Sequence, residues 1–123
     1  MKKVRNRQQK NKISEMLAVL GDGFIQLGTT PEQRENYLRT IATAWNIAIL
    51  DKGIHEKCIA DSIDKFKQAN KGDETHTDAY EENLRKLIDR KLSLFPSVKV
   101  QIINVRIFLE GGQEKISAVS MRM

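Results

Sequence analysis

The pattern of apolar positions is clearest between residues 30 and 50, where it has the period of an α-helix. Apolar side chains recur there every three or four residues and form one stripe: Leu38, Ile41, Ala42, Trp45, Ala48 and Ile49. From Ala44 onward nearly every position is apolar, and only Asn46 interrupts the run. A helix that is apolar on all sides needs neighbours on all sides. The second half of this segment is therefore predicted to lie at the centre of the fold.

The start of this central helix carries a capping signal. Thr30 precedes Pro31, and Gln33 follows the threonine by three positions. In a capping box the threonine side chain accepts from the backbone N–H of Gln33, and the glutamine side chain reaches back to the N–H of Thr30. Proline at the first helical position loses no intrahelical hydrogen bond. We therefore expect the helix to begin at Pro31.

Helical periodicity also covers residues 12–27. One face of this first helix collects the apolar side chains Ile13, Met16, Leu17, Leu20, Phe24 and Leu27. Gly21 and Gly23 fall inside the pattern, and each weakens a helix by about 1 kcal/mol relative to alanine. We expect either a bend at these glycines or the close approach of another backbone.

Two more helices are predicted after the central one. The third runs from about Ile54 to Asn70, with Ile59, Ile63 and Phe66 facing inward. Residues 71–77 are polar and are expected to form a loop, after which Asp78 caps a fourth helix that Pro96 stops. The buried side of this fourth helix is expected to hold Tyr80, Leu84, Leu87, Ile88 and Phe95, with Lys91 between them. The basic cluster Arg85, Lys86, Arg90 and Lys91 is interpreted as ion-pair partners and as compensation of the helix dipole near its C-terminus.

The period then changes from near 3.6 to 2, which predicts a C-terminal β-hairpin. Strands are expected at Val98–Leu109 and Glu114–Arg122, joined by a two-residue Gly-Gly turn that tolerates positive φ. With this turn, Glu110 lies opposite Gln113. The fold class is accordingly mainly α (α+β): four helices followed by a two-stranded hairpin.

Neither face of this hairpin is purely polar. One face holds Ile103, Val105, Ile107, Leu109, Ile116 and Ala118. The other holds Val98, Val100, Ile102, Phe108, Val119 and Met121. The phase changes at Ile102 and Ile103, so a bulge there would bring apolar patches to one side. Alternatively, the helices cover one face and another chain covers the other, which makes the second set a candidate partner-contact surface.

Charge is concentrated at the N-terminus. The first 12 residues hold six basic and no acidic side chains, whereas the rest of the chain is close to neutral, with 15 basic and 16 acidic residues. We interpret residues 1–11 as a flexible basic arm before a single domain, residues 12–123. An arm of this kind could also contact the phosphates of nucleic acid, through Lys2, Lys3, Arg5, Arg7, Lys10 and Lys12. The single Cys58 and the lack of a signal peptide or membrane span favour a cytoplasmic location.

Candidate chemistry is sparse. His55 and Cys58 lie three apart on the third helix, as an imidazole-activated thiol would require, but the cysteine falls on the apolar side, where a small buried side chain is the usual role. An acidic cluster lacks the ligand spacing of an EF-hand and is better explained as a solvated loop and helix cap: Asp73, Glu74, His76 and Asp78. Asn46 needs a hydrogen-bond partner in the core, at an edge or in a pocket.

These observations predict no catalytic residue, no metal site and no cofactor, and no motif assigns the chain to a family. The expected function is that of a small non-enzymatic protein-interaction module, adaptor or accessory, which contacts another protein or a second copy of itself through the hairpin. The alternatives are a nucleic-acid-binding accessory protein that uses the basic arm, and a small enzyme that uses His55 and Cys58.

Overall fold

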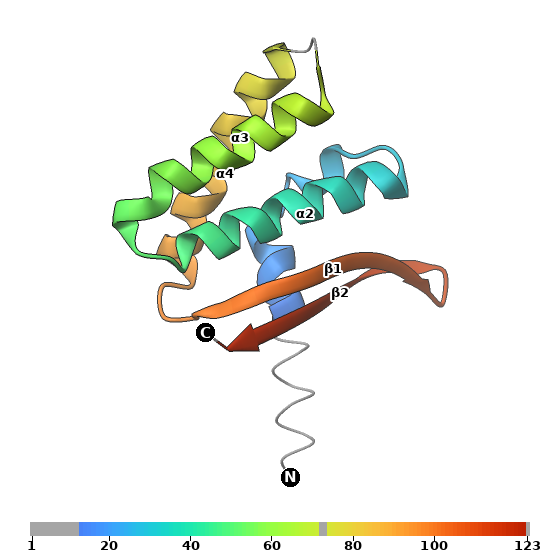
Figure 1. Ribbon diagram of the computed structural model, residues 1–123. Helices are drawn as coiled ribbons and strands as arrows, with labels where there is room; N and C mark the ends of the chain where they lie inside the picture. The colour runs from blue at the N-terminus through green and yellow to red at the C-terminus, as the bar shows by residue number, and fades with distance from the viewer. Residues whose placement is uncertain (1–12, 72–73, 123) are drawn as a thin grey trace.

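The computed structural model describes residues 13–71 and 74–122, with the side chains of residues 74 and 75 left out of the description (Figure 1). A first helix covers residues 13–20. The elements after it are η1 (Ile25–Leu27), α2 (Pro31–Ala48), η2 (Lys52–Ile54), α3 (His55–Ala69), α4 (Glu74–Leu94), β1 (Val100–Glu110) and β2 (Gln113–Arg122). The expected fold class is confirmed: helices come first, and an antiparallel two-stranded sheet ends the chain.

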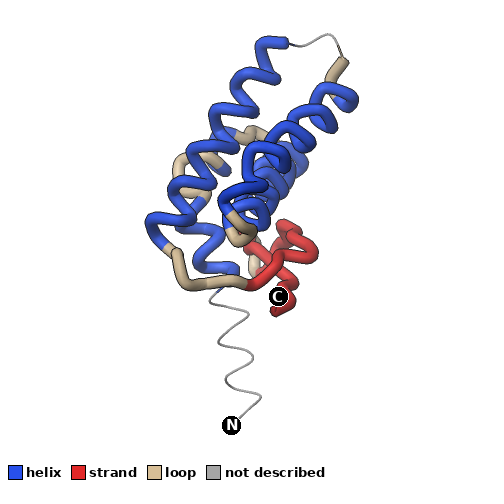
Figure 2. Tube along the Cα trace, turned by 60° about the vertical axis from the view of Figure 1, so that its left-hand side comes forward, coloured by secondary structure: helices blue, strands red, loops and turns tan. Residues whose placement is uncertain are grey.

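Helix α2 is the element around which the others gather. It contacts α3, α4, η1 and β1. Figure 1 shows α3 and α4 as an antiparallel pair on one side of α2 and the hairpin on the other side. Figure 2 shows both strands on one flank of the helices. The layer order is therefore helix pair, central helix, hairpin.

The core confirms the prediction for the second half of α2. Trp45 is fully buried, with 0% of its surface exposed, and Ala44 and Ile47 beside it are buried too. The buried apolar residues supplied by the other elements are Ile13, Met16, Leu17, Leu20, Ile59, Leu84, Leu87, Ile88, Ile102, Val105 and Ala118. The Trp45 ring lies 6.0 Å from that of Phe95, between centroids. The helices and the hairpin thus share one core with the tryptophan in its middle.

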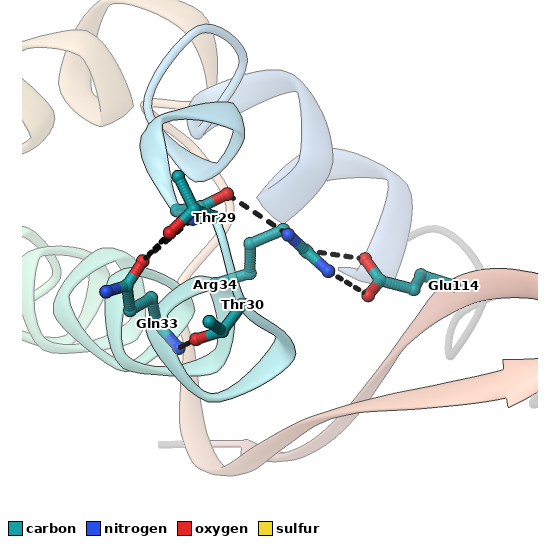
Figure 3. A network of polar contacts seen from close by, with 6 residues as sticks. Thr29, Thr30, Gln33, Arg34 and Glu114 are labelled. Carbon is teal, nitrogen blue, oxygen red and sulfur yellow. Dashed lines mark hydrogen bonds and ion pairs between the residues drawn. The ribbon is translucent and has the colours of Figure 1, made fainter.

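The N-terminus of α2 confirms half of the capping box and corrects the other half. The backbone N–H of Gln33 donates to Oγ1 of Thr30 at 3.1 Å, as expected (Figure 3). The glutamine side chain does not return to Thr30. Its Oε1 instead accepts from the N–H and the hydroxyl of Thr29, at 2.8 and 2.7 Å. Thr29 offers two donors side by side, whereas the backbone of Thr30 offers only one.

The first helix is shorter than predicted. It ends at residue 20, a turn follows, and only η1 is helical after it. At Gly21 a side chain, and not the expected backbone, packs close, because a Cβ built there would clash with Cδ1 of Ile41 in α2. Gly23 adopts a φ of 81°, which breaks the helix. As a consequence, the prediction that Leu27 faces inward is wrong: it is 62% exposed.

The fourth helix is longer than predicted. It begins at Glu74, so the expected loop is wrong for residues 74–77, which are helical, and the expected cap at Asp78 is wrong. Polarity marks exposure and does not by itself exclude a helix, and acidic side chains in a first turn favour a helix N-terminus. Helix α3 agrees with its prediction to within one residue at each end. Ile54, the predicted first residue of this helix, instead lies in η2 and is 45% exposed.

The hairpin forms with the predicted register. Glu110 pairs with Gln113, and Gly111 and Gly112 take φ values of 60° and 80°. The ladder shifts between Ile102 and Asn104, where the phase change predicts a bulge. Because of this bulge, Ile102 and Val105 are both buried on the side that faces the helices.

Candidate interaction surface

Side chains of helix α2 form hydrogen bonds with the backbone along the outer edge of β1. The indole Nε1 of Trp45 donates to the carbonyl oxygen of Val100 at 2.8 Å. The carboxamide of Asn46 donates to the oxygen of Ile102 at 2.9 Å, and its Oδ1 accepts from the N–H of Ile102 at 2.8 Å. Asn46 thereby makes the pair of hydrogen bonds that a neighbouring strand would make with Ile102. The hydrogen-bond partner that the sequence analysis required for Asn46 is therefore the backbone of β1.

Further along the hairpin, acidic and basic side chains continue the attachment to α2. The N–H of Ile107 donates to Oε1 of Glu35 at 3.1 Å. Near the turn, Arg34 holds the carboxylate of Glu114 with two nitrogens, Nε at 2.8 Å from Oε2 (Figure 3). This hydrogen bonding lowers the pKa of Glu114 and raises that of Arg34. The hairpin is therefore attached to α2 at both of its ends.

These hydrogen bonds show which backbone N–H and C=O groups of β1 point towards α2, and this determines where the backbone groups of β2 point. Residues of an antiparallel pair turn their N–H and C=O groups alternately towards and away from the partner strand. Ile102 and Ile107 turn theirs to α2. Their opposite residues in β2, Ser120 and Ile116, therefore turn theirs away from β1, and so does Ala118 between them. The outer edge of β2 thus presents backbone donors and acceptors.

This outer edge is unpaired within residues 13–71 and 74–122. The sheet has two strands, and no backbone hydrogen bond from a loop or turn of the described chain reaches β2. The stretch Ile116–Met121 contains neither a charge nor a proline, the two devices that commonly block the edge of a sheet. One edge of the hairpin is thus blocked by α2, while the other is suited to pair with a further strand.

The candidate partner-contact residues are divided by the bulge. Ile102 lies in the core at 4% exposure, and Val98 and Val100 are half-buried against it. The remaining three are exposed on the side of the hairpin away from α2: Phe108, Val119 and Met121. Ile103, the extra residue of the bulge, is exposed as well. The exposed apolar surface next to the open edge is therefore formed by Val119 and Met121.

Lys91 is buried among the apolar side chains of α4, as its predicted place on the buried side of this helix indicates, but the sequence did not show its hydrogen-bond partners. It is 1% exposed, and its ammonium group donates to the carbonyl oxygens of Phe95 and Val98, both at 2.7 Å. Its Nζ lies 4.8 Å from the centroid of the Trp45 ring. Burial, with repulsion from Lys99, lowers the pKa of the ammonium. These contacts fix the connection between α4 and β1, so the role of Lys91 is structural.

The other members of the basic cluster behave largely as expected. Arg85 bonds Glu81 at 3.0 Å and also reaches Glu56 of α3 at 2.8 Å, which raises the pKa of Arg85 and lowers that of Glu56. Lys86 pairs with Glu82 at 3.0 Å. Both i,i+4 pairs are those that the sequence indicates.

The histidine of the candidate His55–Cys58 pair is hydrogen-bonded elsewhere. Nε2 of His55 lies 2.8 Å from the carbonyl oxygen of Leu50, so the imidazole donates there. His55 is buried, Cys58 is half-buried, and the described chain has no hydrogen bond between them. The imidazole thus secures the start of α3.

Two other predictions fall partly or wholly outside the described residues. Asp73 lies outside them, as do the side chain of Glu74 and the basic residues of the N-terminal arm up to Lys12. Among the residues that are described, no group of three histidine, cysteine or acidic side chains is placed to hold a metal ion. None of their helices is long and apolar enough to cross a membrane.

Comparison of the chain with family models, with curated proteins and with solved structures finds no match. The function is therefore argued from the surfaces described above.

Proposed function

We propose that this chain is a non-enzymatic interaction module that associates with a second copy of itself by pairing the outer edges of β2. The observation that carries the proposal is the difference between the two hairpin edges. Helix α2 blocks the edge of β1 through Trp45, Asn46 and Glu35, whereas the outer edge of β2 is unpaired in the described chain and is uncharged over Ile116–Met121. An isolated two-stranded sheet is marginal, and two copies joined at β2 form a sheet of four strands.

A twofold axis at Ala118 gives the register that uses the whole strand. Residues of β2 that point outward then face each other, with Ile116 opposite Ser120 of the second copy. The same register places Glu114, which Arg34 of its own copy already holds, opposite Arg122 of the second copy, so no like charges meet directly at the ends of the paired strands. The contact is isologous and closes on itself, which favours a dimer over a fibre.

The exposed apolar side chains lie where this contact needs them. Val119 and Met121 belong to β2 and are 50% and 55% exposed. In the twofold register Val119 lies opposite Ser117 of the second copy, next to the axis, and each Val119 is the diagonal neighbour of the other. Association covers part of this apolar surface, which supplies the non-directional part of the binding free energy.

Light scattering on the full chain tests the proposal. The wild type is expected to have the mass of a dimer, and Val119→Lys is expected to be monomeric because two ammonium groups would meet beside the axis. Leu109→Lys is the matched control: it also exchanges an exposed apolar residue of the hairpin for a charge, but near the turn and away from the β2 edge. A wild-type monomer at millimolar concentration, or equal effects of the two variants, contradicts the proposal.

A second variant separates edge pairing from packing of the apolar faces. Ser120→Pro removes an outward-pointing N–H and leaves the exposed apolar residues in place. Edge pairing predicts a monomer with unchanged helical circular dichroism. A Ser120→Pro dimer as tight as the wild type shows that the faces, and not the edges, associate.

A further inference from the structure

A cleft lies on the helical side of the molecule, away from the β2 edge. It has a volume of about 230 Å³ and is formed by α2, α3, α4 and the turn before η1. Its lining residues are Phe24, Asn36, Tyr37, Thr40, Phe66, His76, Ala79, Tyr80 and Asn83. No residue of the hairpin contributes to it, so what binds there is independent of the self-association proposed above.

Aromatic rings are concentrated at this cleft. The whole chain has seven aromatic residues, and four of them line it. They form two pairs: Phe24 and Tyr37 meet edge to face with 4.7 Å between centroids, and Phe66 and Tyr80 are stacked at 4.3 Å. The core of the domain uses only Trp45 and Phe95 in a comparable way. Phe24 and Tyr80 also pack against the edge of the core, so the rings that wall the cleft are held in place by it.

Polar groups between the rings are available for hydrogen bonds. Asn83 makes no side-chain hydrogen bond within the described residues, and its polar atoms are not sealed from solvent. The same holds for the hydroxyls of Tyr37 and Tyr80. Burial raises the pKa of Tyr80, so its hydroxyl keeps its proton and remains a donor at neutral pH. The cleft thus offers N–H and O–H donors beside ring faces.

The geometry excludes several classes of ligand. No lysine, arginine or carboxylate lines the cleft, and His76 is the one basic side chain in its lining, which is too little to compensate a phosphate. The rings of Phe66 and Tyr80 cover one face of each other and those of Phe24 and Tyr37 meet edge to face, and neither arrangement is that of an aromatic cage for a cation. A stacked pair at 4.3 Å leaves no slot between its members for a planar base. The volume of about 230 Å³ is also below the roughly 300–1,000 Å³ of sites that enclose a whole cofactor.

A polyproline II segment meets all of these conditions. It is uncharged, and its pyrrolidine rings pack on aromatic faces. It has no internal hydrogen bonds, so its carbonyl oxygens are free to accept from side-chain donors. It also lies across an open cleft and needs no enclosed volume. We propose that this cleft binds a proline-rich segment of another protein, with the two ring pairs contacting prolines and Asn83 and Tyr80 donating to its carbonyls.

Titration calorimetry of the full chain with a synthetic decaproline tests this proposal, with a glycine–serine peptide of equal length as the comparison. Saturable binding of decaproline alone is expected. Tyr80→Phe keeps the ring that stacks on Phe66 and removes only the hydroxyl, and Asn83→Ala removes the carboxamide. Each is expected to weaken binding about 2–10-fold, the value of one neutral hydrogen bond. Asn104→Ala, at an exposed asparagine of the hairpin, is expected to leave binding unchanged.

Four results overturn the proposal. The first is that decaproline does not bind at millimolar concentration, and the second is that both peptides bind equally. The third is that neither cleft variant changes the affinity for decaproline. The fourth is that free indole, and not the peptide, saturates the cleft. Circular dichroism of each variant checks that its fold is retained. No cleft residue lies in the hairpin, so the two proposals can fail separately. If a cleft variant loses peptide binding and keeps the mass of a dimer, the proposed self-association stands. If a hairpin variant becomes monomeric and still binds the peptide, the proposed cleft stands.

Discussion

Replacing Lys91 with methionine is expected to destabilise the domain strongly, although it removes a charge from the core. Methionine has nearly the length and flexibility of lysine and fills the same space. The change leaves the carbonyl oxygens of Phe95 and Val98 without the donor that now lies 2.7 Å from each. It also removes the cation from its place 4.8 Å from the Trp45 ring.

The magnitude follows from these contacts. The Val98 oxygen is left without a partner, which costs about 1–3 kcal/mol, whereas the Phe95 oxygen still accepts from the N–H of Val98 at 3.4 Å and loses less. The lost cation–π contact adds about 0.5–2 kcal/mol. Against this, the variant no longer has to bury an ammonium group at 1% exposure, a penalty that the present hydrogen bonds already offset in large part. The net loss in the free energy of unfolding is expected to be about 2–4 kcal/mol.

Urea unfolding followed by fluorescence provides the measurement, because Trp45 is the only tryptophan and lies beside the substituted group. Lys86→Met is the matched control. Lys86 is on the same helix, but its side chain is 71% exposed, and its i,i+4 ion pair with Glu82 is worth about 0.3–0.5 kcal/mol. If Lys91→Met costs no more than Lys86→Met, the ammonium group does not hold the α4–β1 connection.

The same residue predicts a pH dependence with a definite sign. Burial lowers the pKa of Lys91 from its ordinary 10.5, so between the lowered pKa and 10.5 the unfolded chain binds more protons than the folded one. Stability contributed by this group therefore rises with pH across that window. The raised pKa of Tyr80 makes stability fall with pH at higher pH, but this contribution is the same in the wild type and in Lys91→Met. The difference in stability between wild type and Lys91→Met should consequently grow with pH, and a difference that shrinks refutes the assigned environment.

Three further outcomes follow from the contacts of α2 and the hairpin. Asn46→Ala is expected to cost about 1–3 kcal/mol and to accelerate hydrogen exchange of the Ile102 amide, while a protected amide would show that another group holds β1. Because hydrogen bonding lowers the pKa of Glu114, its contribution to stability is lost as pH falls from 4.5 through the lowered pKa, and Glu114→Gln should flatten this acid limb in urea titrations. Gly21→Ala is expected to cost about 1–3 kcal/mol by overpacking, whereas Gly53→Ala, with open space at its Cβ, should stay within about 0.5 kcal/mol in the same unfolding assay.

The parts of the fold that the sequence predicts correctly depend on local signals. The apolar stripe and the Thr30 cap define α2, and the Gly-Gly pair with its alternating flanks defines the hairpin, its register and its bulge. These signals are sufficient because periodicity and positive φ are properties of a few neighbouring residues. The start of α4 was predicted wrongly because its first turn is polar, and polarity alone does not distinguish an exposed helix from a loop.

The interaction surfaces depend on contacts between distant parts of the chain, which the sequence does not display. Asn46 was recognised as a polar residue in need of a partner, but its partner, Ile102, lies 56 positions away. Lys91 was assigned to the helix dipole, and one of its bonds, to the Phe95 carbonyl near the end of α4, agrees with that interpretation. The edge that α2 blocks and the edge that stays open are distinguishable only after these bonds are known.

The cleft could not be predicted for the same reason. Its rings come from the turn at Phe24 and from three helices, and the periodicity of each segment taken alone assigns Phe24, Phe66 and Tyr80 to a buried face. The structure leaves these residues half-buried, with their rings paired at the cleft.

An isotope-filtered nuclear Overhauser experiment on an equal mixture of labelled and unlabelled chain tests the central claim most directly. Edge pairing about Ala118 predicts a strong contact between the Hα of Ser117 in one copy and the Hα of Val119 in the other, since residues in non-hydrogen-bonded antiparallel pairs approach most closely. A chain that stays monomeric at the millimolar concentrations of that experiment, or a dimer without any contact between copies along β2, would contradict it.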